Sequence, residues 1–264
     1  MGGDGDVMEF FGRVGKRLLY FNQVLGEMLI LQGKILYYFR EAPRNVQSIL
    51  TQMAIIGYDT LPVAAVMAFF VGMVLALQTG VELQKYGGQN IIGAIVGHSM
   101  VRELGPVMTS FLVAGRVGSA MAAELGVMTV YEEIDALRTL DIDPVRYLAM
   151  PRFIACLICV PALVIYSDCI GIVGGALISN LHPQIFVSYA TYYDSLTAAL
   201  KVKEIGIGLT KAVVFGSLVA LVSCYVGFST TGGARGIGES TTRSVVLSFM
   251  LILVADYFLT RLLM

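Results

Sequence analysis

The sequence is poor in charged residues and contains no tryptophan. Only 14% of its 264 residues are Asp, Glu, Lys or Arg, whereas a soluble domain carries about 25%. Hydrophobic residues make up 56% of the chain, and the mean hydropathy is +0.76. This composition excludes an ordinary soluble domain and predicts a polytopic membrane protein. The net charge of -1 indicates neither nucleic acid nor a strongly anionic surface as a partner.

Motifs for nucleotide binding, metal binding and catalysis are also missing. Neither Gly-Lys pair, at residues 15–16 and 33–34, is followed by the Ser or Thr of a phosphate-binding loop. Cys156 and Cys159 form a CxxC, but no second Cys or His pair completes a zinc site. We therefore expect no metal and no cofactor, four cysteines that remain thiols, and any ATP to be bound by another subunit.

The first 57 residues are predicted to lie at the membrane surface. Residues 1–6 lack a signal-peptide pattern, so the internal spans would direct insertion. Residues 7–25 place apolar and basic side chains on opposite helical faces, which is typical of a helix in the headgroup region. Residues 45–57 favour a second such helix. The alternative is a small soluble N-terminal domain, for which the segment offers little core.

The remaining residues, 58–264, contain five apolar runs long enough to cross a bilayer, which takes about 20 residues. The fold class predicted is therefore an all-α polytopic membrane protein. The expected spans are residues 61–80, 91–125, 153–181, 205–228 and 245–263. Residues 91–125 contain Pro106 and are predicted to form one long, kinked helix. Small residues recur every four positions from Ala64 to Gly80, which lets another helix approach closely.

The segments between the spans differ in character. Residues 182–203 are polar, and tyrosines such as Tyr192 suit the membrane interface. Residues 229–243 are predicted to be a glycine-rich loop. A short charged helix is expected at about residues 129–140, because Thr129 and Glu132 fit a capping box. Spacing alone leaves a solvated loop as an equal alternative there.

Basic residues indicate the orientation of the spans. Arginine and lysine precede span one, and arginine lies between spans two and three and between spans four and five. On the other side, the few lysines are diluted by acidic residues. The positive-inside rule therefore predicts a cytoplasmic N-terminus, a cytoplasmic helix at 129–140 and a C-terminus outside.

Charged residues within the spans are the candidate functional groups, because an unpaired charge there costs at least about 2–3 kcal/mol. Neighbouring helical residues point about 100° apart, so Arg102 and Glu103 need separate partners. Lys211 is an available cation for Glu103, and Arg116 is another. The three further charges are interpreted as structural pairs between helices: Arg116, Asp168 and Asp256.

Two parts of the chain carry long motifs. They are ELGPV, AGRVGSAMAAELG, EEIDALR, IDPVRYL and PR, in this order and spacing, followed by LTKAVVF and GESTTRSVV...ADYFLT. These motifs closely resemble the MlaE/YrbE permease family, and the resemblance covers roughly residues 45–264. Members of this family are the membrane subunits of ABC transporters that move phospholipids between the two membranes of Gram-negative bacteria.

The resemblance implies a homodimer in the bacterial inner membrane that maintains outer-membrane lipid asymmetry and is not itself an enzyme. Two copies of a separate ATPase would drive it, with an MCE-domain lipid-binding protein outside and sometimes a STAS-domain protein inside. The helix at 129–140 would be the coupling helix that docks on the ATPase. Its predicted coupling residues are Glu132, Glu133, Asp135, Leu137 and Arg138. The predicted residues of a lipid pocket between the two copies are Leu75, Leu83, Tyr86, Arg102, Glu103 and Lys211.

Two other classes of function remain open on the residues alone. A secondary transporter would often show an inverted repeat, and none is evident in the sequence. An intramembrane lipid-modifying enzyme would need a catalytic cluster, and none stands out.

Overall fold

The computed structural model describes residues 3–183 and 185–263, and these form only helices and short connections. The side chains of residues 3–18, 20 and 21 lie outside this description, as does most of the predicted amphipathic face of residues 7–25. The α-helices are α1 (Gly3–Tyr38), α2 (Val46–Gly57), α3 (Leu61–Gln84), α4 (Ile92–Ser99), α5 (Gly105–Val113), α6 (Ser119–Val130), α7 (Glu133–Thr139), α8 (Met150–Leu181), α9 (Tyr189–Ala199), α10 (Val202–Phe228) and α11 (Gly233–Leu263).

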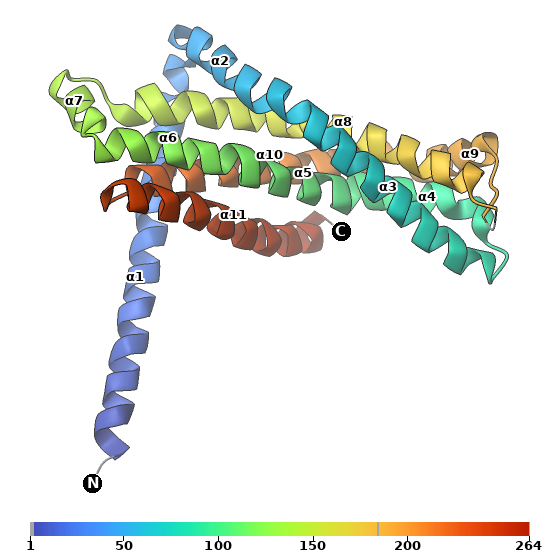
Figure 1. Ribbon diagram of the computed structural model, residues 1–264, viewed down its shortest axis with the longest axis horizontal. Coiled ribbons are helices and arrows are strands. Elements are labelled where there is room, and N and C mark those ends of the chain that lie inside the picture. Colours follow the sequence, from blue (N-terminus) through green and yellow to red (C-terminus); the bar gives the residue numbers. More distant parts are fainter. Residues whose placement is uncertain (1–2, 184, 264) are drawn as a thin grey trace.

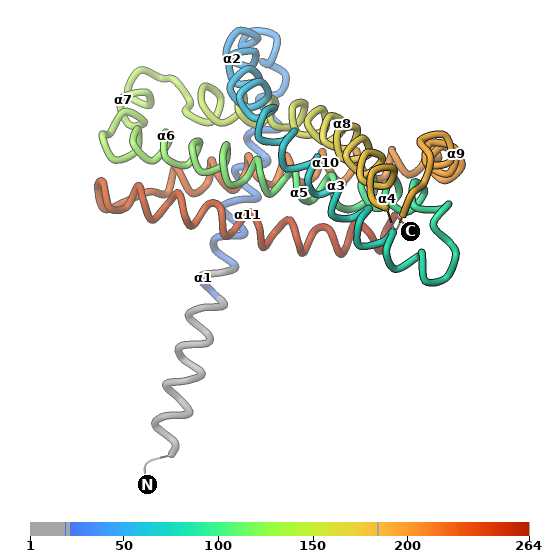
Figure 2. Tube along the Cα trace, turned by 45° about the vertical axis from the view of Figure 1, so that its right-hand side comes forward, coloured from blue at the N-terminus to red at the C-terminus, as the bar shows by residue number. Residues whose placement is uncertain are grey.

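Five helical runs in this part of the chain are long and apolar enough to cross a membrane. They form one elongated bundle, with α7 at one end and α9 at the other (Figure 1). α1 leaves the bundle at a steep angle (Figures 1 and 2). The predicted class, an all-α polytopic membrane protein, is confirmed. The runs are Val46–Gln84, Gln89–Val130, Val145–Leu181, Val202–Phe228 and Gly233–Leu263.

The first span continues directly from the helix before it. α2 and α3 follow one line across the bundle (Figure 1) and are joined only by a 3-10 turn, Tyr58–Thr60. Pro62 lies in the first turn of α3, where its missing N–H is not needed. The predicted start at residue 61 therefore falls inside a continuous helical run.

Small residues determine the contact between α3 and α8. The buried residues of α3 are Ala64, Ala68, Gly72, Ala76 and Gly80. α3 packs along α8, and a Cβ atom on Gly72 would overlap the backbone carbonyl group of Gly171. The predicted small-residue face is thus confirmed, and its partner is α8.

The second span is one helical run with two π-helical turns, Met100–Leu104 and Ala114–Gly118. It connects α4, α5 and α6 without a break from Gln89 to Val130. π turns interrupt the regular hydrogen-bond ladder and often occur at functional positions. The prediction of a single long helix holds, and each of its two π turns contains an arginine, Arg102 or Arg116.

The predicted loop at residues 229–243 is wrong. α11 begins at Gly233, and only residues 229–232 connect it to α10. The glycine serves close packing here, because a Cβ atom on Gly236 would overlap the backbone oxygen of Thr231. α11 packs against α6, and its buried residues recur every four positions. They are Gly236, Ser240, Ser244, Ser248 and Ile252.

The predicted capping box before α7 is also wrong. The Thr129 hydroxyl belongs to the end of α6 and donates to the carbonyl oxygens of Leu125 and Gly227, at 2.7 and 3.1 Å. Glu132 adopts a left-handed backbone conformation with φ of 60°, which turns the chain between α6 and α7. The helix itself is present, but it begins at Glu133.

The polar segment after the third span contains helix α9. Tyr192 is fully buried, and its hydroxyl donates to the backbone oxygen of Ile172 at 3.2 Å. It is therefore a core residue and not the interfacial residue that the sequence predicts. Burial raises the pKa of Tyr192.

Candidate functional site

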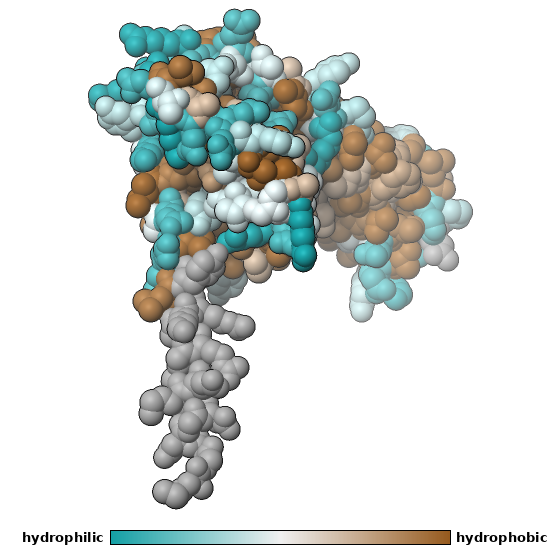
Figure 3. Space-filling model, turned by 60° about the vertical axis from the view of Figure 1, so that its left-hand side comes forward, coloured by the Kyte–Doolittle hydropathy of each residue, from teal (hydrophilic) through white to brown (hydrophobic). Residues whose placement is uncertain are grey.

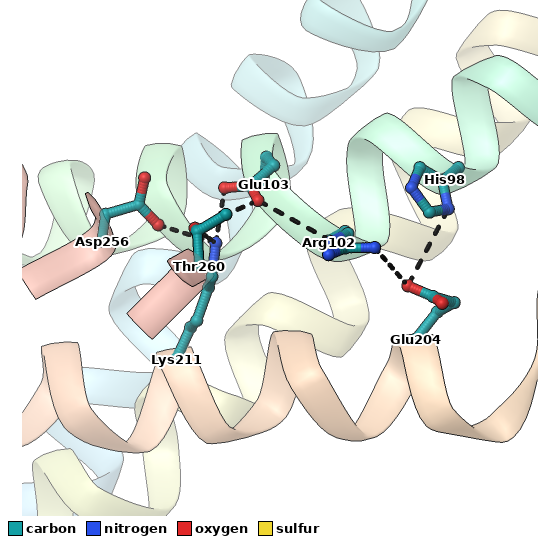
Figure 4. A network of polar contacts seen from close by, with 7 residues as sticks. All are labelled: His98, Arg102, Glu103, Glu204, Lys211, Asp256 and Thr260. Atoms are coloured by element: carbon teal, nitrogen blue, oxygen red, sulfur yellow. Dashed lines mark hydrogen bonds and ion pairs between the residues drawn. The ribbon is translucent and has the colours of Figure 1, made fainter. Parts of the chain in front are cut away.

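Lys211 is the centre of a charged cluster inside the bundle. It lies on α10 and is 0% exposed. Its Nζ atom is 2.5 Å from Glu103 Oε2, 2.7 Å from Thr260 Oγ1 and 2.8 Å from Asp256 Oδ1 (Figure 4). One buried cation therefore holds two carboxylates and a hydroxyl from two other helical runs. The predicted pair of Glu103 and Lys211 is present.

Arg102 extends the cluster along α10. Its Nη1 atom is 3.2 Å from Glu204 Oε2, and the same oxygen is 3.9 Å from His98 Nδ1 (Figure 4). Arg102 Nε is 4.0 Å from Glu103 Oε1 and has no hydrogen-bond partner in the described part of the chain. A row of ionisable side chains thus runs from Asp256 through Lys211, Glu103, Arg102 and Glu204 to His98.

The π-helical turn Met100–Leu104 positions the two adjacent charges. Arg102 points to Glu204 and Glu103 points to Lys211. Glu204 and Lys211 are seven residues apart, so they lie two turns apart on one face of α10. This explains how neighbouring residues of opposite charge each find a separate partner.

The cluster presents its acidic side outward. The side chains of Glu103 and Asp256 are 36% and 22% exposed, whereas Lys211 is buried. Three carboxylates, including Glu204, share two basic side chains, Lys211 and Arg102. In an apolar surrounding such groups are stable only when paired and hydrogen-bonded. The arrangement can therefore hold a further polar or charged group at this level of the membrane.

The other residues predicted to contact lipid lie apart from this cluster. Leu75 and Leu83 are half-buried and pack against a second core cluster that contains Ile92 and Val96. Tyr86, after the end of α3, is 84% exposed. Of the six residues predicted for a lipid pocket, three come together directly: Arg102, Glu103 and Lys211.

The three charges predicted to be structural have different surroundings. Asp256 pairs with Lys211. Arg116 Nη1 donates to Thr60 Oγ1 at 2.8 Å. Asp168 is buried on α8, and its Oδ1 atom has no hydrogen-bond partner among the described residues, so the predicted pairing of Asp168 is not found.

α7 forms a second candidate site at the end of the bundle. Figure 3 shows that this end is largely hydrophilic, whereas the body behind it is hydrophobic. Ile134 is buried and Leu137 is half-buried against the main core, so both anchor α7. The predicted coupling residues with exposed side chains are Glu132, Glu133, Asp135 and Arg138.

The segment after α7 is tied to α1. The Tyr38 hydroxyl donates to Asp143 Oδ2 at 2.7 Å, and this hydrogen bond raises the pKa of Tyr38. Asp143 Oδ1 also accepts from the backbone N–H of Val145 at 2.8 Å. α1 and the connection from α7 to α8 therefore form one contiguous surface.

Three members of the charged cluster are not among the residues predicted from the sequence: His98, Glu204 and Thr260. A signal for two of them exists in the spacing. Glu204 precedes Lys211 by two helical turns, and Thr260 follows Asp256 by one turn, so each shares a face with a charge already singled out. Their position at the ends of spans made them resemble ordinary terminal polar residues.

Five helical runs long enough to cross a membrane, a buried charged cluster and a short charged helix at one end are the features of a multi-pass membrane protein. The chain matches the family Permease MlaE over residues 49–262. The chain belongs to this family and is an ABC transporter permease.

Relatives extend over nearly the whole chain. A probable ABC transporter permease of Rickettsia typhi is 40% identical over 95% of this chain and 96% of its own length. A second one, from Synechocystis, is 38% identical over 92% of this chain and 91% of its own length. The chloroplastic protein TRIGALACTOSYLDIACYLGLYCEROL 1 of Arabidopsis thaliana is 38% identical over 88% of this chain and 65% of its own length.

Proposed function

We propose that this permease moves phospholipids between the inner and outer membranes and so maintains the lipid asymmetry of the outer membrane. It would act as a homodimer in the inner membrane, with two copies of an ATPase that binds all the ATP. An MCE-domain protein outside would complete the transporter, together with the STAS-domain protein that some members of the family have inside. The name of the Arabidopsis relative contains that of a diacylglycerol glycolipid, which supports a lipid as the substrate of this permease.

The observation that carries the proposal is the charged cluster around Lys211. A phospholipid brings a phosphate group for which Arg102 offers an unpartnered Nε atom and the forked geometry of a guanidinium group. The partly exposed carboxylates of Glu103 and Asp256 suit the ammonium or hydroxyl groups of a headgroup. The exposed apolar face of α11 next to the cluster includes Met250, Leu253 and Tyr257 and suits acyl chains or the second copy.

The second helical run offers a route from the ATPase to this cluster. α7 follows α6 directly, and the run Gln89–Val130 carries Arg102 and Glu103 near its other end. We propose that ATP-driven closure of the ATPases pushes α7 and shifts this run, which changes the contacts of Glu103 with Lys211. α7 would then lie in the cytoplasm, as the distribution of basic residues predicts.

Phospholipid co-purification tests the lipid site. We expect Arg102→Ala and Glu103→Ala to lower the phospholipid retained by the purified permease, with the dimer intact. Arg102→Lys should recover part, because lysine keeps the charge but loses the fork. Arg235→Ala is the matched control, because Arg235 is an exposed arginine that pairs with Glu239 one turn away. Loss of assembly together with normal lipid content in the surviving protein would make the cluster structural.

A further inference from the structure

α2 carries a polar face although it belongs to a membrane-spanning run. Its residues Gln47, Ser48, Thr51 and Gln52 line a cavity of about 370 Å³ together with Tyr147, Leu148, Pro151 and Arg152. An adjoining cavity of about 160 Å³ shares Gln52 and is also lined by Arg116 and Glu124. The two cavities lie side by side between α2 and the helices α6 and α8 and are together called the groove; the second also has apolar walls, including Ile55 and Met121.

Arg152 is a charged residue in the lining of the groove, and it is almost completely buried. It is only 6% exposed. Its Nη2 atom donates to Glu124 Oε2 at 2.9 Å, and its Nη1 atom donates to the Leu148 carbonyl oxygen at 3.2 Å. Its Nε atom has no hydrogen-bond partner among the described residues. A buried donor without an acceptor costs about 1–3 kcal/mol, so Arg152 keeps one unsatisfied donor in this structure.

The charges in the groove indicate the kind of group that it suits. Two guanidinium groups, of Arg152 and Arg116, and one carboxylate, of Glu124, line the two cavities. Asp59 lies 3.8 Å from Arg116 but lines neither cavity. The Ser48 hydroxyl and the side-chain amides of Gln47 and Gln52 supply further donors, whereas the Thr51 hydroxyl donates to the Gln47 carbonyl oxygen. The groove therefore suits an anionic oxygen group such as a phosphodiester.

An apolar surface lies directly beside the polar face. Val46 and Leu50, about one helical turn apart on α2, are 48% and 58% exposed, whereas Ile55, 45% exposed, lines the second cavity. A ligand of this groove thus meets charges on one side and an open hydrophobic face on the other. A free phosphate ion would use only the first, whereas a phospholipid would use both.

We propose that the groove between α2 and the start of α8 binds the phosphodiester headgroup of a phospholipid, whose acyl chains lie against the exposed apolar face of α2. The groove lies towards the α7 end of the bundle, because α8 begins just after α7 and its first residues form the wall. In the orientation proposed above this is the cytoplasmic leaflet. The lipid is distinct from the one proposed at the Lys211 cluster, and only the assignment of the leaflet rests on the proposed function.

Blocking the groove tests the proposal. Ser48→Trp and Thr51→Trp start from exposed positions, so they fill the groove while the helix folds. Val66→Trp is the matched control, because Val66 is an exposed apolar residue of α3 that lines neither cavity. Each purified permease is equilibrated with vesicles of phosphatidylethanolamine and phosphatidylglycerol, and the tightly bound phospholipids per chain are counted by native mass spectrometry.

We expect Ser48→Trp and Thr51→Trp to lose one bound phospholipid per chain, and Val66→Trp to lose none. Arg152→Lys should retain the lipid but release it more readily. An unchanged lipid count in both groove variants overturns the proposal, and so does a loss of dimer in place of lipid, which would make the groove a face between two copies. Arg102→Ala is measured in parallel. If Arg102→Ala loses a lipid and the groove variants do not, the proposed function stands and only the lipid site in the groove is ruled out.

Discussion

At the scale of single residues, Lys211 is a fully buried charged side chain whose burial must be compensated by its contacts. A fully buried ammonium group on a membrane helix is stable because Glu103, Asp256 and Thr260 all lie within hydrogen-bond distance. The same contacts keep two carboxylates in place that would otherwise repel each other. The cluster is thus a single unit, and its members cannot be removed one at a time without consequence.

Lys211→Met should destabilise the permease strongly. It leaves Glu103 and Asp256 beside each other without a counter-charge, and breaking one partner of a buried ion pair costs about 3–5 kcal/mol. Thermal unfolding of the purified protein in detergent measures the effect. The triple variant Lys211→Met, Glu103→Gln, Asp256→Asn should recover most of the loss, because it removes all three charges. Equal stability of Lys211→Met and the native chain would show that these contacts contribute little.

The pairing of Glu103 with Lys211 could be predicted because every charge inside a span needs a partner. The partner of Arg102 could not, because Glu204 stands just before the predicted start of its span and resembles a surface residue. Side-chain reach across two helices depends on their separation and on the π turn at Met100–Leu104. Neither quantity is visible in local sequence.

At the scale of elements, length and hydropathy sufficed to find all five spans, because both are local properties. The same reasoning failed at the start of α11, where glycine and serine are typical of a loop. The helix forms there because small residues at every fourth position pack against α6. The start of α7 was missed for the opposite reason, since a left-handed Glu132 replaces the expected cap.

Charge reversal on α7 tests its role as the coupling element. Glu132, Glu133 and Asp135 are exposed, so their replacement by lysine should leave the fold intact. We expect the triple variant to lose the co-purifying ATPase, or to uncouple ATP hydrolysis from transport, because the electrostatic match to the partner is reversed. Lysine at Glu239, an exposed glutamate of α11, is the control. Unchanged ATPase binding and unchanged transport would remove the assignment of α7.

At the scale of the whole molecule, α7 lies at one end of the bundle (Figure 1) and follows the helical run Gln89–Val130, which carries Arg102 and Glu103. The α7 end is largely hydrophilic (Figure 3), which suits a docking surface outside the bilayer. α1 leaves the bundle at a steep angle (Figure 1), which agrees with a helix that lies along the membrane surface. The helical run Gln89–Val130 would thus link an ATPase bound at α7 to a lipid bound at Arg102 and Glu103.

Cysteine labelling tests the orientation. Single cysteines at Thr139 and Ala234, in a chain otherwise free of cysteine, should be protected from an impermeant thiol reagent added outside intact cells. Cysteines at Asn90 and Asp194 should react, and all four positions are exposed. Permeabilised cells provide the control, since every site should then react. The reverse pattern would place α7 outside and remove the proposed ATPase contact.

The most direct test of the account is ATP-driven phospholipid transfer by the complete transporter in proteoliposomes. Arg102 and Glu103 are proposed to contact the lipid that the permease moves. We predict that Arg102→Ala lowers the transfer of a fluorescent phospholipid at least about tenfold, which corresponds to about 1.4 kcal/mol. ATPase binding and the dimer should be retained, and Arg235→Ala should transfer lipid like the native chain. Native transfer rates in both Arg102→Ala and Glu103→Ala would contradict the account.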